Sequence, residues 1–431
     1  MKIIKHELKD DRYTLHAQAS AQNVNKAYEL AQMSFAAQVG LKPEDGSSIE
    51  QAAREKLGIE DLDATIMPEI GEFLMPFVMD KFGVLPAIPP TVVVEGEAKR
   101  DNPVDLRVSF LKKPEFELTS YEPVEFTIVK TGVSDAQVEE QIEIIAKNAA
   151  TFEATDATKV KDGDFVKIAL TAKENGKEVE SLCTEGRTYS IGKKLMPKSF
   201  DTALIGMKVG EEKSFTVDLA QDTPEGEKPA RPLDCVVKIL EVQKIVIPAI
   251  NDEWLKENAP FYPNMDAMRE DIKNRMLEQN EIDFANKQMD MAAKELAKRF
   301  EGKISDEIYE QMHTQLISNI RRQVQSQGMD FNEFVENQGG QQNFSMTLMV
   351  QARDMLREGY ALEALFRNKK LVVSEKDTLA ACREMSPGDP EWFHKQSVEA
   401  GRSWAIREAS ERMCASKYLI NTARITIQEE D

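Results

Sequence analysis

Residues 160–171 read Val-Lys-Asp-Gly-Asp-Phe-Val-Lys-Ile-Ala-Leu-Thr, and their pattern indicates how the middle of the chain folds. Its apolar residues Val166, Ile168 and Leu170 alternate with residues that face the other way, and a period of two is typical of a β-strand with one buried face. An Asn-Gly pair follows at residues 175–176 and favours the tight turn of a β-hairpin. The chain is therefore predicted to fold back on itself as an antiparallel pair.

The same alternation recurs further along the chain. We expect strands at 188–191, 212–219 and 234–242, and one short helix at 199–204. Together these elements predict a compact β domain over residues 159–246 that contains a single helix.

The segment before it has the pattern of a small α+β domain over residues 1–115. The predicted elements are two strands joined by a charged turn, three helices and two final strands, at 2–8, 13–18, 23–39, 49–57, 62–82, 91–97 and 104–110. Residues 116–158 carry one strand near 124–129 and one helix near 135–150. We expect this segment to be a connector.

Beyond Pro248 the pattern is helical to the end of the chain, so residues 247–431 are predicted to form an all-α domain. Asn264 is placed to cap a helix whose apolar residues recur at helical spacing, namely Met265, Met268, Ile272 and Met276. The longest helix is expected over about 344–369, and a final helix precedes a short strand at 425–427. The fold class is therefore multidomain α+β.

Composition excludes several classes of protein. A chain of 431 residues is long enough for two to four domains, at about 100–200 residues each. The formal net charge of −20 opposes binding to nucleic-acid phosphates, so direct DNA binding is not expected. The chain has no glycine-rich nucleotide-binding motif, and its His and Cys residues lack the spacing of a metal site. No cofactor and no metal are predicted.

The location of the protein is inferred from its first residues and its cysteines. Charged residues interrupt the first apolar stretch, which lacks the continuous apolar core of a signal peptide. The apolar stretch at 73–94 is broken by prolines and charges, so it is not a candidate membrane span. The four cysteines lie far apart, which fits a reducing compartment. A cytoplasmic protein is expected.

The order of these parts resembles that of the trigger factor family, bacterial ribosome-associated folding chaperones with an inserted FKBP-type prolyl isomerase domain. The resemblance covers essentially the whole chain. It is carried by residues 160–171, by Tyr-Ser-Ile-Gly at 189–192, by Phe-Asp-Thr-Ala-Leu-Ile-Gly-Met-Lys-Val-Gly-Glu-Glu at 200–212 and by Pro-Ala-Ile-Asn-Asp-Glu-Trp-Leu at 248–255. It implies an N-terminal domain like the family's ribosome-binding domain, an FKBP-like domain and a helical chaperone domain whose arms form a cradle for substrates.

The resemblance also implies an isomerase cleft, which in the family is apolar and lined by aromatic rings. By alignment to the family motif, Phe200 and Tyr189 keep aromatic positions and Met196 keeps an apolar wall. Rings are missing where the family usually has them, at Leu170, Val179 and Cys235; Pro197 replaces a branched aliphatic residue, Arg187 lies at another pocket-side position, and the loop 222–232 has no aromatic residue. Because each ring contributes about 0.5–1.5 kcal/mol to such contacts, we expect the isomerase activity to be weak or lost.

The ribosome-docking loop of the family has the pattern Gly-Phe-Arg-x-Gly-Lys. The corresponding loop here reads Gly40-Leu41-Lys42-Pro43-Glu44-Asp45. The apolar residue and the first cation are kept, whereas two acidic residues stand in the second half of the loop and oppose contact with RNA. The ribosome is therefore a doubtful partner, and an ordinary solvated loop is the alternative.

The helical domain contains twelve methionines. Methionine is flexible and polarizable and is common on promiscuous binding surfaces, although most of these residues are predicted to face the core. The favoured function is an ATP-independent chaperone for unfolded or nascent chains, as a monomer or weak homodimer. The alternatives are an active prolyl isomerase acting on folding intermediates and a ribosome-independent assembly chaperone for one partner.

Overall fold

The computed structural model describes residues 1–42, 47–174, 176–193, 196–223, 226–386 and 388–430. The chain divides into two compact units. The first contains Met1–Val129 and Phe284–Gln428, and the second contains Lys130–Asp283 with the last three residues. The mixture of helices and strands confirms the predicted multidomain α+β fold.

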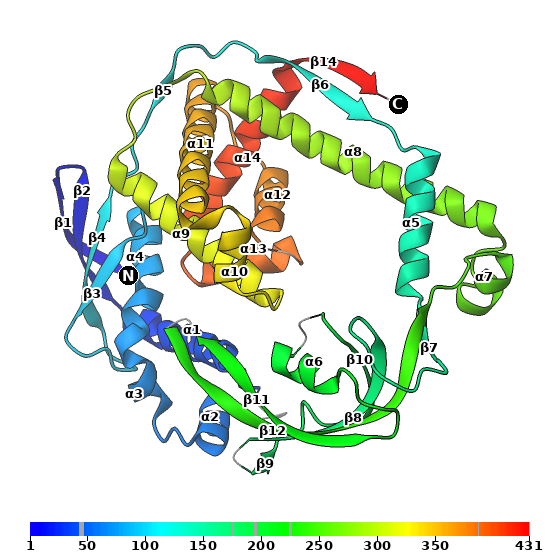
Figure 1. The fold of residues 1–431 in the computed structure, drawn as a ribbon. Helices are drawn as coiled ribbons and strands as arrows, with labels where there is room; N and C mark the ends of the chain where they lie inside the picture. Colours follow the sequence, from blue (N-terminus) through cyan, green and yellow to red (C-terminus); the bar gives the residue numbers. More distant parts are fainter. Residues whose placement is uncertain (43–46, 175, 194–195, 224–225, 387, 431) are drawn as a thin grey trace. The chain divides into compact units, whose positions relative to one another are not determined.

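The N-terminal part of the first unit is a four-stranded antiparallel sheet with helices packed against it (Figure 1). Its strands lie in the order β1-β2-β4-β3, with β1 at Lys2–Lys9, β2 at Arg12–Ala19, β3 at Thr91–Glu95 and β4 at Val104–Leu111. Asp10 and Asp11 join β1 to β2 with φ angles of 50° and 57°, as a two-residue hairpin turn requires. The core contains Leu15, Leu74, Leu106 and Phe110.

The helices of this part follow the sequence prediction with one correction. The structure has α1 at Ala21–Gln38 and α2 at Ile49–Leu57. The single helix predicted over 62–82 is wrong, because α3 (Leu62–Ile66), a short 3-10 helix (Met67–Glu69) and α4 (Ile70–Phe82) replace it. Pro68 lies in the 3-10 segment and has no N–H to continue an α-helical ladder.

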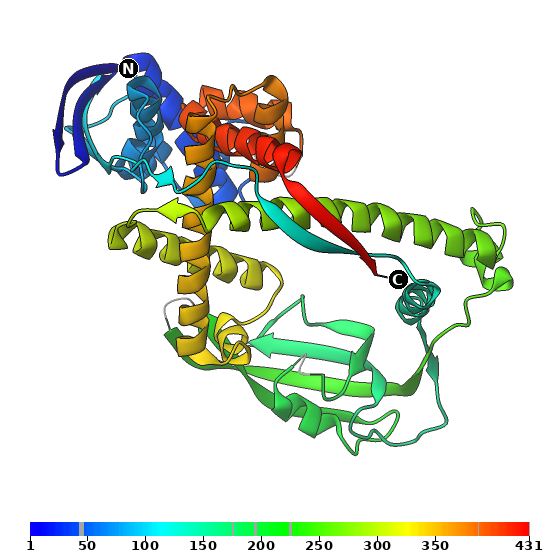
Figure 2. The same ribbon diagram turned by 90° about the horizontal axis from the view of Figure 1, so that it is seen from above.

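The helical body occupies the C-terminal part of the first unit. It is built from α9 (Asp306–Ser326), α10 (Phe331–Asn337), α11 (Gly340–Asn368), α12 (Glu375–Met385), α13 (Pro390–Glu399) and α14 (Ser403–Thr422). α11 packs against α9 and α10 and against α14 (Figures 1 and 2). Its core is formed by Leu356, Tyr360, Ala364, Leu365 and Leu419.

The longest helix is α8 (Met265–Ala297), which has 33 residues against 29 for α11, so the expectation that 344–369 is the longest helix is wrong. The predicted cap of α8 is confirmed, because Asn264 Oδ1 accepts a hydrogen bond from the Ala267 N–H at 2.9 Å. No glycine or proline interrupts the sequence from this cap to residue 301. Because no such residue ends it, α8 continues beyond its apolar first turns into a stretch whose apolar pattern is weak.

The second unit contains the β domain. Its strands are β7 (Thr151–Ala154), β8 (Phe165–Glu174), β9 (Lys177–Glu178), β10 (Thr184–Ser190), β11 (Glu212–Thr223) and β12 (Gly226–Val246), with one helix, α6 (Lys198–Leu204). The main sheet has the order β10-β8-β12-β11. Beside it, α5 (Asp135–Asn148) and α7 (Asp252–Asn258) share a small core with the first turns of α8.

The expected connector over 116–158 is divided among several partners. β5 (Glu117–Leu118) pairs with β13 (Phe300–Glu301), and β6 (Glu125–Thr131) pairs with β14 (Arg424–Glu430). β7 pairs with the end of β12, so the β domain begins near residue 151 where the sequence placed its start at 159. These are pairings between distant segments, which local patterns do not reveal.

Candidate functional site

Three aromatic rings form the centre of the β domain. They belong to Tyr189 on β10, Phe200 on α6 and Phe215 on β11. The rings of Tyr189 and Phe200 meet edge to face at 5.2 Å, and those of Phe200 and Phe215 do so at 5.4 Å. Tyr189 and Phe200 are buried, whereas Phe215 is half-buried. Sequence reasoning missed Phe215, although its place in the alternating stretch 212–219 was a usable signal.

A buried carboxylate fixes the edge of this aromatic group. Asp201 on α6 accepts a hydrogen bond from the Tyr189 hydroxyl and another from the Gly192 N–H at 3.1 Å. Burial raises the pKa of Tyr189, and the neighbouring Asp201 raises it further. Tyr189 therefore remains a neutral donor, and its ring is held in one orientation.

The other predicted cleft residues gather around the same rings. Leu170 and Cys235 are buried in the core, while Val179 and Met196 are half-buried and pack against it. Pro197 directly precedes α6 and its carbonyl accepts a hydrogen bond from the Phe200 N–H at 2.8 Å. Arg187, by contrast, is exposed on β10.

Cys235 lies deep in this cluster. Its strand position is opposite Phe215 on β11 and opposite Ala172 on β8. Burial raises the pKa of Cys235 to about 11, with a further contribution from Asp234. The thiol therefore stays protonated near neutral pH and acts as a small core residue.

The predicted docking loop follows α1. Gly40 has a φ of 66° and ends the helix, and the Leu41 N–H donates to the Ala36 carbonyl at 2.8 Å. The side chain of Leu41 is only 8% exposed and belongs to the N-terminal core, whereas Lys42 is exposed. Pro43, Glu44 and Asp45 lie outside the described residues.

A largely apolar groove of about 580 Å³ lies between α9 and α11. One wall is formed on α9 by Tyr309, Glu310 and His313, and the other on α11 by Met346, Met349, Val350 and Arg353. These α11 residues lie on one face at helical spacing. Met346 is 59% exposed, Met349 is 61% exposed and Val350 is 45% exposed.

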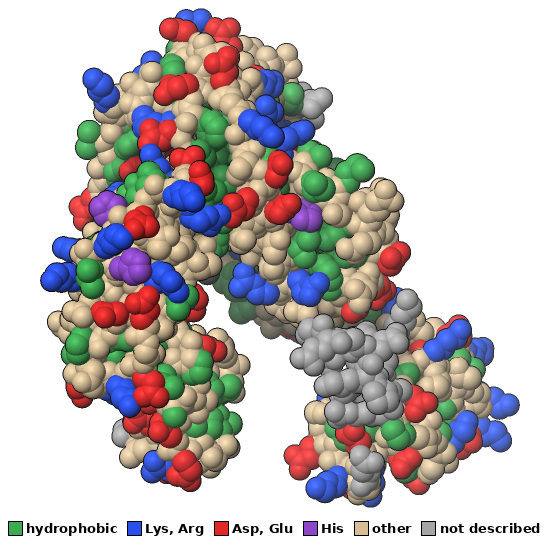
Figure 3. Space-filling view, turned by 90° about the vertical axis from the view of Figure 1, so that its left-hand side faces the viewer, with side chains coloured by type: hydrophobic (Ala, Val, Ile, Leu, Met, Phe, Trp, Pro, Cys, Tyr) green, Lys and Arg blue, Asp and Glu red, His purple; other side chains and the backbone are tan. Residues whose placement is uncertain are grey.

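The twelve methionines of the helical domain divide between core and surface. Met268 is buried, and Met265, Met276 and Met312 pack against a core. Five are exposed: Met329, Met346, Met349, Met355 and Met385. On the face drawn in Figure 3, hydrophobic side chains form separate patches between acidic and basic ones. Exposed methionines near a helix-lined groove are typical of adaptable binding surfaces.

Three parts of the chain match models of known protein families. Residues 1–145 match the family model for bacterial trigger factor protein, and residues 264–409 match the model for its C-terminus. Residues 156–230 match the model for FKBP-type peptidyl-prolyl cis-trans isomerase. The chain belongs to the bacterial trigger factor family. It is a folding chaperone with an FKBP-type domain.

Individual trigger factors are similar over most of their length. That of Shouchella clausii is 21% identical over 387 residues, which cover 89% of this chain and 88% of the relative. That of Pelotomaculum thermopropionicum is 23% identical over 374 residues, which cover 84% of each chain. A solved structure from work on substrate recognition by the trigger factor chaperone aligns with 18% identity and a TM-score of 0.40, covering 97% of this chain and 100% of that one.

Among the described residues, no group of three or more His, Cys, Asp or Glu side chains could hold a metal ion. The helices of this part of the chain include no candidate membrane span.

Replacing Asp201 with alanine is expected to destabilise the FKBP-type domain of this trigger factor by about 1–3 kcal/mol, because the Tyr189 hydroxyl and the Gly192 N–H lose their acceptor. Hydrogen exchange of β10 and α6 in the full chain measures this loss. Thr202→Ala is the matched control, since the hydroxyl of the exposed Thr202 donates a hydrogen bond only within α6, to the Lys198 carbonyl at 2.8 Å. Equal exchange in the two variants would contradict the structural role of Asp201.

Proposed function

We propose that this trigger factor binds apolar segments of unfolded or nascent chains in the groove between α9 and α11 and releases them without ATP. The observation that carries the proposal is the exposure of Met346, Met349 and Val350 on one face of α11. Ordinary surface helices place such residues against the core. Here they line a groove of about 580 Å³ instead.

The chemistry of the groove suits weak and unselective binding. Methionine side chains have three rotatable bonds and a polarizable sulfur, so they adapt to client side chains of different shape. Burying one Leu, Phe or Met of a client contributes about 1.5–3 kcal/mol, so a short segment is held reversibly. Asp306, Glu310 and Arg353 add charge beside the apolar lining and support solubility.

Introducing charge at two groove positions tests the proposal. Met346→Glu with Met349→Glu should abolish most suppression of aggregation of a chemically unfolded client, because binding would then bury carboxylates against apolar side chains. Light scattering without nucleotide measures the suppression. Because both side chains are exposed, circular dichroism should be unchanged.

Met385→Glu is the matched control, since Met385 is 44% exposed on α12 and does not line the groove. It should retain the activity of the unaltered protein. Full activity of the double groove variant, or an equal loss in the control, would show that the groove is not the client site.

The FKBP-type domain carries the second candidate activity, prolyl isomerisation. Two observations support a weak activity at most. Leu170 and Cys235, at positions where the family usually has rings, are buried. The rings of Tyr189 and Phe200 are buried as well, and only that of Phe215 is half-buried among the three rings of the cluster. Amide rotation at proline has a barrier of about 18–20 kcal/mol, and lowering it requires a pocket that a substrate proline can enter. We infer that this domain contributes architecture and peptide contact more than catalysis.

Proline-limited refolding separates the two activities. We expect the slow phase to keep a time constant close to the uncatalysed value of tens to hundreds of seconds. A short proline peptide assayed in parallel removes any effect of client binding in the helical body. Strong acceleration of both reactions that is lost in Met196→Ala would establish the domain as an active isomerase.

We do not propose that the loop after α1 docks on the ribosome. Leu41, the apolar residue of the expected docking loop, is buried in the N-terminal core. Of the three predicted docking residues, only Lys42 presents a charge at the surface. The proposed partners are therefore unfolded or nascent chains, without the ribosome.

A further inference from the structure

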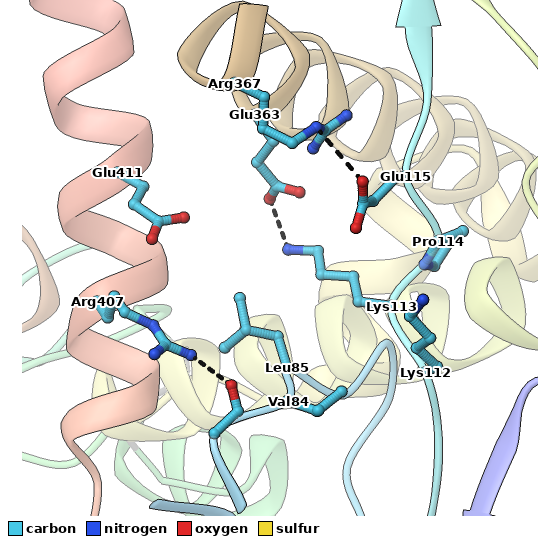
Figure 4. Close-up of a pocket in the computed structure, with 11 residues that line it drawn as sticks. Val84, Leu85, Lys112, Lys113, Pro114, Glu115, Glu363, Arg367, Arg407 and Glu411 are labelled. Carbon is cyan, nitrogen blue, oxygen red and sulfur yellow. Dashed lines mark hydrogen bonds and ion pairs between the residues drawn. The ribbon is translucent and has the colours of Figure 1, made fainter. Parts of the chain in front are cut away.

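Four charged side chains form a partly buried cluster between the N-terminal domain and the helical body, in which Glu408 is 21% exposed and Arg412 is 38% exposed. Lys113 Nζ lies 2.5 Å from Glu363 and 2.6 Å from Glu408. Arg412 completes the cluster, at 2.6 Å from Glu363 and 2.9 Å from Glu408. The side chains of Lys113 and Glu363 are each 10% exposed. Figure 4 shows Lys113 pointing from the segment after β4 toward Glu363.

The cluster joins separate parts of the first unit. Lys113 lies two residues beyond β4 of the N-terminal sheet, whereas Glu363 is on α11 and Glu408 and Arg412 are on α14. Gly359 leaves the space that Arg412 occupies, because a Cβ there would lie 3.1 Å from the guanidinium. Burial works to raise the pKa of Glu408, but Arg412 and Lys113 outweigh it and the pKa is lowered.

Packing around Lys113 is loose. A cavity of about 370 Å³ borders residues 112–115 together with Leu85, Glu363 and Arg407 (Figure 4). Another of about 480 Å³ borders the same four residues together with Lys303 and Ile308. The hollows border residues 112–115 themselves, whereas Leu111 and Phe116 at the two ends of the segment pack against the core of the helical body. Lys113 adds its ion pairs to these apolar contacts.

The apolar part of the same interface contains Ala87, Ile88 and Leu111, which pack against the core of the helical body, and a close contact at Gly401. Gly401, in the turn before α14, approaches Phe77 of α4 so closely that a Cβ would lie 2.7 Å from its ring. Trp404 packs against the N-terminal core, and Arg407 donates to the Gly83 carbonyl at 2.9 Å. This contact would be uncovered if the N-terminal domain moved away from α14.

We propose that the Lys113 cluster is a latch that holds the N-terminal domain on the helical body and can open. Such an ion cluster adds little net stability compared with apolar packing, but removal of Lys113 leaves the buried Glu363 paired with Arg412 alone. The interface is therefore closed when all four side chains are present and opens when an uncharged residue replaces Lys113. Opening exposes Phe77 and Trp404, so the latch sets how much apolar surface the protein presents.

Substitution of Lys113 tests the latch. Lys113→Met should increase amide exchange in α4 by at least about tenfold, because Glu363 and Glu408 then share only Arg412. In a variant that keeps Trp404 alone, through Trp254→Phe and Trp392→Phe, acrylamide quenching should rise in parallel. Lys112→Met is the matched control, since Lys112 is the exposed neighbour on the same segment.

Two further variants keep the test decisive if Lys113→Met perturbs folding. Lys113→Arg retains the charge and should leave exchange and quenching unchanged. With Glu408→Gln already present, Lys113→Met should have a smaller effect than it has alone, because one carboxylate fewer is left unpaired. Equal effects of Lys113→Met and Lys112→Met, or additive effects of the Lys113 and Glu408 changes, would overturn the proposal.

Discussion

Burial of the C-terminal half of α11 in the helical body organises the first unit of the structure. The buried residues there are Leu356, Tyr360, Ala361, Ala364 and Leu365. Because a helix is stiff, fixing this half also fixes the direction of the other half, which carries the methionines of the groove. The same buried half presents Glu363 to Lys113. One packed helix thus positions both the client groove and the contact with the N-terminal domain.

The exposed half of α11 is stabilised by a small core of its own. Phe344 and Leu348 pack with Val335 of α10 and with partly buried residues of α9. This leaves the opposite face free to remain apolar and exposed. Such a surface is a liability in most proteins, but here it is limited in extent and the chain carries a net charge of −20. Exposure and solubility are therefore compatible.

Much of the fold could be predicted from local sequence, because alternation and helix caps are local properties. The strand around Ile168, the turn at Asp10 and the cap at Asn264 were found in this way. The family was also recognisable from motif order. Pairings between distant segments, such as β7 with β12, were not accessible. Nor was the exposure of Met349, since periodicity shows which residues share a face but not whether a neighbouring element covers it. The burial of Leu41 depends on tertiary packing for the same reason.

Site-specific photo-crosslinking shows directly whether clients bind in the groove between α9 and α11. A photoreactive side chain at position 349 in the full-length protein should form covalent adducts with an unfolded client, and the adducts should disappear when the client has folded. The same probe at the exposed position 385 provides the comparison. Efficient adducts at 349 and few at 385 are predicted. Adducts at 385 alone, or none at 349 while aggregation is still suppressed, would contradict the claim.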